Sequence, residues 1–253
     1  MNIAVILSGG SGSRMKGGNI PKQYIEVGGK PIICYGLETF QEHPMIDAIV
    51  IVADEKYQEM LDEWMEKGRI SKFADYAPSG RTRQHSIYSG ITVAHEVIEW
   101  YEIPTEIGGY VRVGVKEETE DAEDIVIIHD AARPCVSEQI ITDCINGAIE
   151  CGGAMPVITV KDTVYQSIDG KTIGGLLNRD ELFAGQAPEA FKLDSYLAIH
   201  DAMSDEELAE VRGSSEIAYK HGMKIKLVKG EEANFKITTK EDLDKFRAQI
   251  SDQ

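Results

Sequence analysis

Two stretches of the 253-residue chain combine glycine with basic side chains, a pairing suited to holding phosphate groups. The first is LSGGSGSRM at 7–15, which is followed by Pro-Lys-Gln at 21–23. Glycines let backbone N–H groups turn toward a phosphate chain and approach it closely, and Arg14 and Lys22 can add full positive charges. The sequence therefore predicts an anion-binding loop over 8–12, directly after an apolar segment.

This loop does not fit the two familiar nucleotide-binding patterns. The pattern G-x-x-x-x-G-K-[ST] fails because no Gly-Lys-Ser/Thr follows, and G-x-G-x-x-G fails because Met15 occupies the last glycine position. A dinucleotide-dependent reductase is therefore disfavoured. A tight turn without a ligand is the alternative interpretation of the glycines taken alone.

The second stretch is GRTRQHSI at 80–87, a polar and basic loop that leads into an expected helix. Backbone donors at Gly80, the charge of Arg83 and the hydroxyl of Ser86 could hold a base or a ribose. The alternative is an ordinary helix start with Thr82 as its N-cap.

A third stretch, IHDAARP at 128–134, follows an apolar segment that reads as a buried strand. A carboxylate at the end of such a strand is well placed to hold Mg²⁺ or a substrate hydroxyl, which makes Asp130 the candidate metal ligand. Arg133 would meet a phosphate, and the small Ala131 indicates a ligand close to the backbone. We interpret His129 as structural rather than catalytic; a simple turn is the alternative for Asp130.

The elements that must position these residues alternate between strand-like and helix-like segments. Apolar runs at 2–7, 48–52 and 124–128 are continuous rather than alternating, which indicates a sheet covered on both faces. Strand–helix repetition makes that sheet mainly parallel, and ligands of such sheets gather beyond the carboxyl ends of the strands. We therefore expect a Rossmann-like α/β fold with helices on both faces and a site at the loops that begin at Ser8 and His129.

Later segments complete this organisation. Helical spacing of apolar residues predicts helices around 33–40, 57–64, 87–98 and 140–148, the last with Ser137 as N-cap, and a further helix near 193–203. A strand is expected at 224–229 and a last helix after a capping box formed by Thr238 and Glu241. Glycines interrupt the pattern within 161–185, which we interpret as a β-arm projecting from a single domain spanning 1–253.

Composition limits the classes of partner. A net charge of −17 repels nucleic acid, and no apolar stretch approaches the ~20 residues that span a bilayer. The four cysteines include no C-x-x-C pair, so we expect reduced thiols and a cytoplasmic protein. Basic residues nonetheless gather in loop-like segments, which favours a local site for an anionic small molecule.

Taken together and in this order, these stretches resemble the bacterial 2-C-methyl-D-erythritol 4-phosphate cytidylyltransferases and the related ribitol 5-phosphate cytidylyltransferases. The resemblance extends from Ile3 to about Leu243. It implies CTP and a polyol phosphate as substrates, pyrophosphate as product, a divalent cation and a homodimer. It assigns the catalytic role to Arg14, Lys22 and Lys236, nucleotide binding to Leu7, Ser8, Gly9, Gly10, Ser11, Gly12, Gly80, Arg83, Ser86 and Ala131, and acceptor binding to Asp130, Arg133, Thr163 and Arg179. By the same resemblance, an arm delivers the last two residues into the neighbouring subunit's site.

Three departures from the family pattern bear on the acceptor rather than on CTP. Gln186-Ala187-Pro188 stands where the family has Gln-Thr-Pro, and 212–215 reads RGSS where it has Thr-Asp-Asp-Ala. The segment 99–124 is also longer than usual. The full match over 128–134 favours methylerythritol phosphate and isoprenoid synthesis, whereas the altered 212–215 stretch favours ribitol phosphate and a cell-wall or capsule polymer.

Two other classes remain open at this point. A catalytically silent nucleotide-binding module would keep the fold without the chemistry, and pyrophosphate release would separate it from an enzyme. A sugar-1-phosphate nucleotidyltransferase shares a glycine-rich start, but the HDAARP hexapeptide argues against it.

Overall fold

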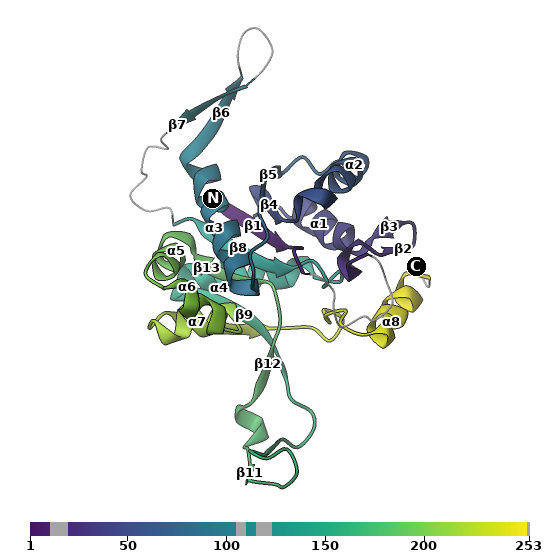
Figure 1. Ribbon diagram of the computed structural model, residues 1–253, viewed down its shortest axis with the longest axis vertical. Helices are drawn as coiled ribbons and strands as arrows, with labels where there is room; N and C mark the ends of the chain where they lie inside the picture. The colour runs from purple at the N-terminus through teal and green to yellow at the C-terminus, as the bar shows by residue number, and fades with distance from the viewer. Residues whose placement is uncertain (11–19, 105–109, 115–122, 252–253) are drawn as a thin grey trace.

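An eight-stranded sheet forms the centre of the computed structural model, which describes residues 1–10, 20–104, 110–114 and 123–251 (Figure 1). Its strands lie in the order β12-β9-β13-β8-β1-β4-β5, with β14 also paired to β9. The bounds are β1 Asn2–Leu7, β4 Ala48–Val52, β5 Phe73–Ala77, β8 Ile125–Asp130, β9 Gly152–Thr159, β12 Phe183–Gly185, β13 Glu189–Lys192 and β14 Lys224–Lys229.

The pairing directions make this sheet mostly parallel. β1 pairs in parallel with both β4 and β8, β4 with β5, and β14 with β9. β13 is antiparallel to both β8 and β9, and β12 is antiparallel to β9, so these two short strands run against the rest. The expected α/β class with a mainly parallel sheet is confirmed.

Helices cover both faces of the sheet, as the continuous apolar strands required (Figure 1). Along β1, Ala4 and Ile6 belong to one buried cluster and Ile3 and Val5 to another, because successive side chains of a strand point to opposite faces. The first cluster includes residues of α1, α2 and α4, and the second includes residues of α3, α5, α6 and α7. The helices are α1 Ile32–Glu42, α2 Gln58–Gly68, α3 Arg83–Glu99, α4 Glu138–Cys151, α5 Leu193–Asp201, α6 Asp205–Glu210, α7 Ser214–Lys220 and α8 Lys240–Ser251.

Two antiparallel pairs project from opposite ends of the body (Figure 1). One is the pair β6 Trp100–Pro104 and β7 Tyr110–Gly114, which accounts for part of the long 99–124 segment. The other is β10 Tyr165–Gln166 and β11 Gly175–Leu176, within the arm expected from the glycines of 161–185. The 99–124 segment also contains the acidic sequence EETEDAED at 117–124, most of which lies outside the described residues.

The cap of the last helix differs from the expected Thr238–Glu241 box by one residue. The Asp242 N–H donates to Thr239 Oγ1 at 3.2 Å, and the Thr239 N–H donates to Asp242 Oδ2 at 2.8 Å. Asp242 Oδ2 also accepts from the backbone and the hydroxyl of Thr238. The shorter carboxylate of Asp242 therefore closes the box in place of Glu241, because it reaches both threonine N–H groups at once.

No helix in the described part of the chain has the length and apolar content that a membrane span requires.

The end of helix α2 has a backbone conformation that bears on stability. Arg69 ends α2 in the left-handed conformation, with φ 54° and ψ 44°. A side chain in this conformation costs free energy that glycine avoids.

We predict that Arg69→Gly raises the free energy of unfolding by about 0.5–1 kcal/mol, because Arg69 is exposed and its main role at this position is conformational. Urea unfolding at neutral pH measures the change. Arg69→Ala is the matched control, since it removes the same side chain but keeps the left-handed cost. Equal stability of the glycine and alanine variants would contradict the prediction.

Candidate active site

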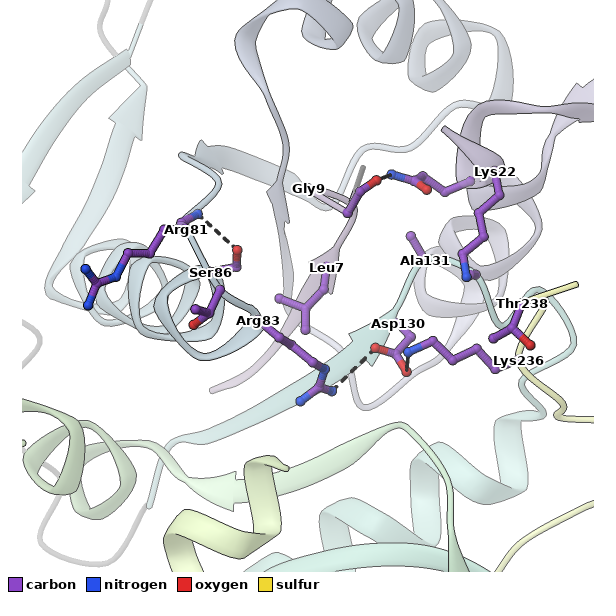
Figure 2. Close-up of a pocket in the computed structure, with 15 residues that line it drawn as sticks. Leu7, Gly9, Lys22, Arg81, Arg83, Ser86, Asp130, Ala131, Lys236 and Thr238 are labelled. Atoms are coloured by element: carbon purple, nitrogen blue, oxygen red, sulfur yellow. Dashed lines mark hydrogen bonds and ion pairs between the residues drawn. The ribbon is translucent and has the colours of Figure 1, made fainter. Parts of the chain in front are cut away.

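A cavity of about 470 Å³ opens at the carboxyl ends of β1 and β8 (Figure 2). Parallel pairing sets Leu7, the last residue of β1, opposite Asp130, the last residue of β8, so the loops that follow both strands meet at one edge. The start of α3 and the segment before α8 complete the walls. The lining residues in the described part of the chain are Leu7, Gly9, Gly10, Lys22, Gln23, Gly80, Arg81, Thr82, Arg83, Ser86, Asp130, Ala131, Ala132, Lys236 and Thr238.

Most of the predicted site residues share this cavity. Lys22 and Lys236 both line it, although they are far apart in the sequence (Figure 2). The others brought together are Leu7, Gly9, Gly10, Gly80, Arg83, Ser86, Asp130 and Ala131. Three predicted residues, Ser11, Gly12 and Arg14, lie outside the described residues.

Four predicted residues are not brought into the cavity: Ser8, Arg133, Thr163 and Arg179. Ser8 is 2% exposed, and its hydroxyl donates to the Val52 carbonyl at 2.9 Å, which anchors the start of the glycine loop. Thr163 and Arg179 are exposed residues of the arm, where Arg179 Nη1 donates to the Lys161 carbonyl at 3.0 Å.

Gln23 supports the glycine loop from behind, a role that we did not predict. It is 3% exposed, and its amide donates to the Gly10 carbonyl at 3.0 Å and also to the Ser8 carbonyl. Its neighbour Tyr24 makes a 3.0 Å hydrogen bond with Ser8 Oγ. Gln23 directly follows Lys22 in the Pro-Lys-Gln motif at 21–23, and this position could have identified it from the sequence. Arg81, Thr82, Ala132 and Thr238 also line the cavity without having been predicted, and each lies within or next to a quoted motif.

The turn at Gly80 leaves no room for a side chain. A Cβ built at Gly80 would lie 2.6 Å from the His85 carbonyl carbon and 2.7 Å from the Ser86 nitrogen. The Gly80 N–H donates to Ser86 Oγ at 3.0 Å, so these two residues, both predicted to bind the nucleotide, are joined directly. Thr82 Oγ1 accepts from the His85 N–H at 3.4 Å. The helix-start interpretation and the ligand-site interpretation of this loop are therefore compatible.

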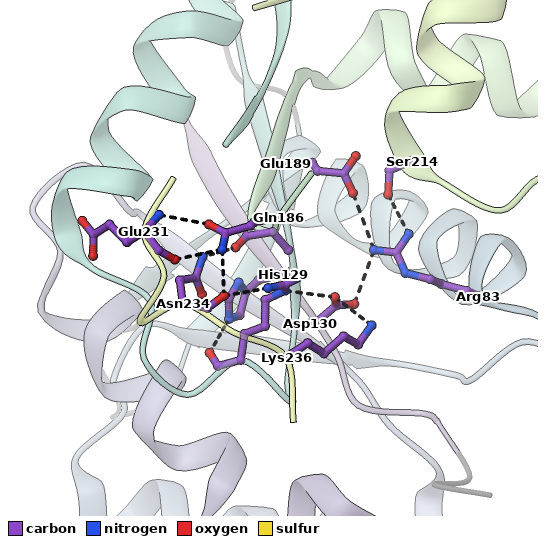
Figure 3. A network of polar contacts seen from close by, with 11 residues as sticks. Arg83, His129, Asp130, Gln186, Glu189, Ser214, Glu231, Asn234 and Lys236 are labelled. Carbon is purple, nitrogen blue, oxygen red and sulfur yellow. Dashed lines mark hydrogen bonds and ion pairs between the residues drawn. The ribbon is translucent and has the colours of Figure 1, made fainter. Parts of the chain in front are cut away.

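Asp130 is the electrostatic centre of the site (Figure 3). The Asp130 side chain is 11% exposed, and its carboxylate accepts from Lys236 Nζ at 2.9 Å. Arg83 Nη2 lies 3.4 Å from Oδ1, and Arg133 Nε lies 3.5 Å from Oδ2. Burial alone would raise the pKa of Asp130, but the charges of Arg83, Lys236 and Arg133 outweigh it and hold the pKa well below its usual range. The carboxylate therefore stays ionised at every physiological pH.

Arg133 positions the segment that carries Lys236 and does not enter the cavity. Its Nη1 donates to the Asn234 carbonyl at 2.6 Å. Asn234 is fully buried, and its amide donates to the Ala187 carbonyl at 2.7 Å. The Ile237 N–H donates to the Ala132 carbonyl at 2.9 Å. These bonds fasten the segment before α8 to the loop after β8, and so they set the distance between Lys236 and Asp130.

Comparisons with known proteins show the family of this chain and agree with its fold. Residues 2–102 and 109–251 match the family model described as 2-C-methyl-D-erythritol 4-phosphate cytidylyltransferase, IspD. The chain belongs to this family. It is therefore a cytidylyltransferase, one of the nucleotidyltransferases, as the resemblance had implied.

Curated relatives of this cytidylyltransferase carry two different names. The ribitol-5-phosphate cytidylyltransferase of Streptococcus agalactiae serotype Ia is 31% identical over 98% of this chain and 95% of the relative. The 2-C-methyl-D-erythritol 4-phosphate cytidylyltransferase of Clostridium tetani is 34% identical over 96% of this chain and 87% of the relative. Among solved structures, the 4-diphosphocytidyl-2C-methyl-D-erythritol synthase of Anaerococcus prevotii matches with a TM-score of 0.75 at 26% identity, covering 99% of this chain and 96% of that one.

His129 precedes Asp130 but is buried behind the cavity, 1% exposed, with Nε2 3.0 Å from the Arg133 carbonyl. Burial lowers the pKa of its ring to about 4, because the charged form would lose its hydration. The ring is therefore neutral at neutral pH, which agrees with the structural role predicted for it.

We predict that His129 makes the enzyme less stable as the pH falls from about 6.5 to about 4. The unfolded chain binds a proton at this histidine in that window while the folded chain does not, so the free energy of unfolding decreases by up to about 3 kcal/mol. Urea unfolding at several pH values compares the wild type with His129→Gln. The variant should show the smaller decrease, and identical slopes for the two proteins would refute the assignment.

Proposed function

We propose that this enzyme transfers the cytidylyl group of CTP to the phosphate of a polyol phosphate and releases pyrophosphate. The charge of the cavity carries the proposal. Among the described residues, Lys22, Arg83 and Lys236 line it with the single carboxylate of Asp130, in a chain of net charge −17; Arg81 also lines it, but its guanidinium is paired with Asp205. A positive cavity in an acidic protein concentrates anionic ligands locally, which suits a triphosphate and a phosphomonoester that repel each other.

The chemistry requires alignment and charge neutralisation more than proton transfer. An oxygen of the acceptor phosphate attacks the α-phosphorus of CTP, and the bond from that phosphorus to the oxygen bridging to the β-phosphate breaks. Pyrophosphate leaves with the bonding electron pair. A phosphomonoester is largely ionised at neutral pH, so no general base is needed. The described cavity lining contains no histidine or cysteine, which is consistent with such a mechanism.

The roles follow from charge and position. Lys22, together with the predicted Arg14, stabilises the charge that develops on the α-phosphate and on the pyrophosphate. The glycine loop holds the triphosphate, and Gly80 and Ser86 hold the nucleoside. Lys236, fixed by its 2.9 Å contact with Asp130, holds the acceptor phosphate in line for attack.

We propose that the enzyme uses Mg²⁺, with Asp130 as its protein ligand. Mg²⁺ in nucleotide enzymes is held by one or two carboxylates plus substrate phosphates and water. Asp130 is the carboxylate among the described lining residues, and no cluster of three or more acidic, histidine or cysteine ligands occurs in the described part of the chain. Asp130 would share its carboxylate between the cation and Lys236. The bound cation would neutralise charge on the triphosphate.

For the acceptor, we propose 2-C-methyl-D-erythritol 4-phosphate, which would make the enzyme part of isoprenoid synthesis. The matching family model and the HDAARP hexapeptide support this choice. Ribitol 5-phosphate is the second candidate, supported by the relatives named for it and by the RGSS sequence at 212–215. Ala187 is 2% exposed and outside the cavity lining, so its missing hydroxyl does not distinguish them.

We also propose a cytoplasmic location. All four cysteines are free thiols, as expected for a reducing compartment.

We predict that Lys22→Ala lowers turnover by about 10²–10³-fold while the protein stays folded, because one preorganised positive charge is lost from the reacting phosphates. Pyrophosphate release measured with CTP and each of the two polyol phosphates checks both the function and the acceptor. Lys67→Ala is the matched control, since Lys67 is exposed on α2, away from the cavity.

Near-normal turnover of Lys22→Ala would remove Lys22 from the mechanism. Wild-type protein that binds CTP but releases no pyrophosphate with either acceptor would favour the silent nucleotide-binding module instead.

We propose that the enzyme is a homodimer joined through the arm. Apolar side chains of the arm are exposed in the single chain, Ile168 by 96%, Ile173 by 71% and Leu176 by 68%. Apolar residues gathered on one projecting element indicate a surface that a partner covers. Thr163 and Arg179 also lie on this arm and outside their own chain's cavity, as expected of residues that act in the neighbouring site.

We predict that two inactive variants, Arg179→Ala and Lys236→Ala, regain activity when mixed and allowed to exchange subunits. Each mixed dimer would contain one intact site, which amounts to about a quarter of wild-type turnover overall. Pyrophosphate release before and after exchange measures it. Two Lys236→Ala preparations mixed together are the control. A fully active monomer in sedimentation would rule the dimer out.

A further inference from the structure

The guanidinium of Arg83 is held from behind by side chains that do not line the cavity (Figure 3). Its Nη1 donates to Ser214 Oγ at 2.8 Å, and its Nη2 lies 3.6 Å from Glu189 Oε1. On the cavity side, Nη2 also lies 3.4 Å from Asp130 Oδ1. Arg83 therefore stands between two carboxylates, of which only Asp130 is part of the cavity wall.

Glu189 and Ser214 are themselves fixed by the elements around them. Glu189 is 7% exposed, and its Oε2 accepts from the Ser215 N–H at 2.8 Å and from the Ser215 hydroxyl at 2.6 Å. Ser214 is fully buried, and its carbonyl accepts from the Tyr196 hydroxyl at 3.2 Å. Buried groups with satisfied hydrogen bonds have little freedom to rearrange, so they hold Arg83 in one orientation.

The position of Arg83 relates it to the acceptor more than to the nucleoside. Figure 2 shows its guanidinium directed toward Asp130 and Lys236, away from Arg81 and the turn before α3. The Arg83 side chain is 31% exposed and lines the cavity. A planar guanidinium with several donors suits a phosphate, which it can bind through two parallel hydrogen bonds.

Glu189 also places a second negative charge beside Arg83. Asp130 carries one negative charge and already contacts two cations, Lys236 and Arg133, so without a second carboxylate the charge of Arg83 would be left largely uncompensated. The 212–215 stretch provides none, because it reads RGSS and contributes only hydroxyl and backbone groups. The carboxylate comes instead from Glu189, the first residue of β13, which is in register with Ile128 of β8.

We propose that Glu189, together with Ser214, is a positioning residue that orients Arg83 to bind the phosphate of the acceptor, and that this pair thereby sets the affinity for the acceptor independently of CTP. The inference rests on the proposed transfer reaction, and it concerns the same cavity. Without the Glu189 charge, Arg83 would turn toward Asp130, compete with Lys236 for its carboxylate and lose its alignment with the acceptor phosphate.

Glu189→Gln tests the proposal, because it removes the charge and keeps an oxygen that can accept from Ser215. We expect the KM for the acceptor to rise about tenfold, the size of one charge-assisted hydrogen bond, with kcat and the KM for CTP within about twofold of wild type. Glu189→Asp, which keeps the charge, should recover part of the acceptor affinity. Glu150→Gln is the control, since Glu150 pairs with Lys226 on the exposed surface.

Ser214→Ala is the second variant in case Glu189→Gln does not fold; it removes the other contact to Arg83 and should raise the acceptor KM in the same way. An unchanged acceptor KM in a folded variant, or an equal rise in the KM for CTP, overturns the proposal.

If the wild type releases no pyrophosphate, the transfer reaction is wrong, and calorimetric titration of 2-C-methyl-D-erythritol 4-phosphate, the proposed acceptor, then tests Glu189 separately. About tenfold weaker binding to Glu189→Gln, with unchanged CTP binding, supports the proposal. Equal binding to wild type and variant overturns it.

Discussion

Asp130 holds an ionised carboxylate that is almost completely removed from water, and three cationic side chains make this possible. A buried charge is costly unless it is paired and hydrogen-bonded, and removing one partner leaves the other uncompensated. Lys236, Arg83 and Arg133 reach Asp130 from three different parts of the chain. The segments that form the cavity walls therefore meet at this single carboxylate. The segments that carry the three cations are in turn held by contacts farther from Asp130.

The balance of charge explains how an acidic protein can hold anions. In the described part of the chain most carboxylates are exposed, so water and salt screen them. The cavity edge, in contrast, gathers basic side chains near the carboxyl ends of the strands. Two negatively charged substrates can then be brought close together without the full cost of their repulsion.

The contacts that hold Lys236 and Arg83 in place differ on the two sides of Asp130. On one side, buried amides and Arg133 fasten the segment of Lys236 to the loop after β8 through hydrogen bonds to backbone carbonyls. On the other side, Glu189 and Ser214 hold Arg83 from the β13 and α7 elements. Arg133, Asn234, Glu189 and Ser214 are not among the described residues that line the cavity. The alignment of the cations thus depends on packing and hydrogen bonds that a ligand does not contact.

The local sequence pattern was sufficient to predict many helices and strands of this protein and its family. Helical spacing around Leu37 or Ile91 and the continuous apolar run at 48–52 each specify their own conformation, and the order of the motifs identified the family. Local pattern cannot choose among competing partners, because that choice depends on distances across the sheet. Arg83 faces the cavity while Arg133 turns to Asn234, and Asp242 rather than Glu241 caps the last helix. Lys236 meets Asp130 across 106 residues of sequence, a contact that only the register of β1 with β8 and the path before α8 decide.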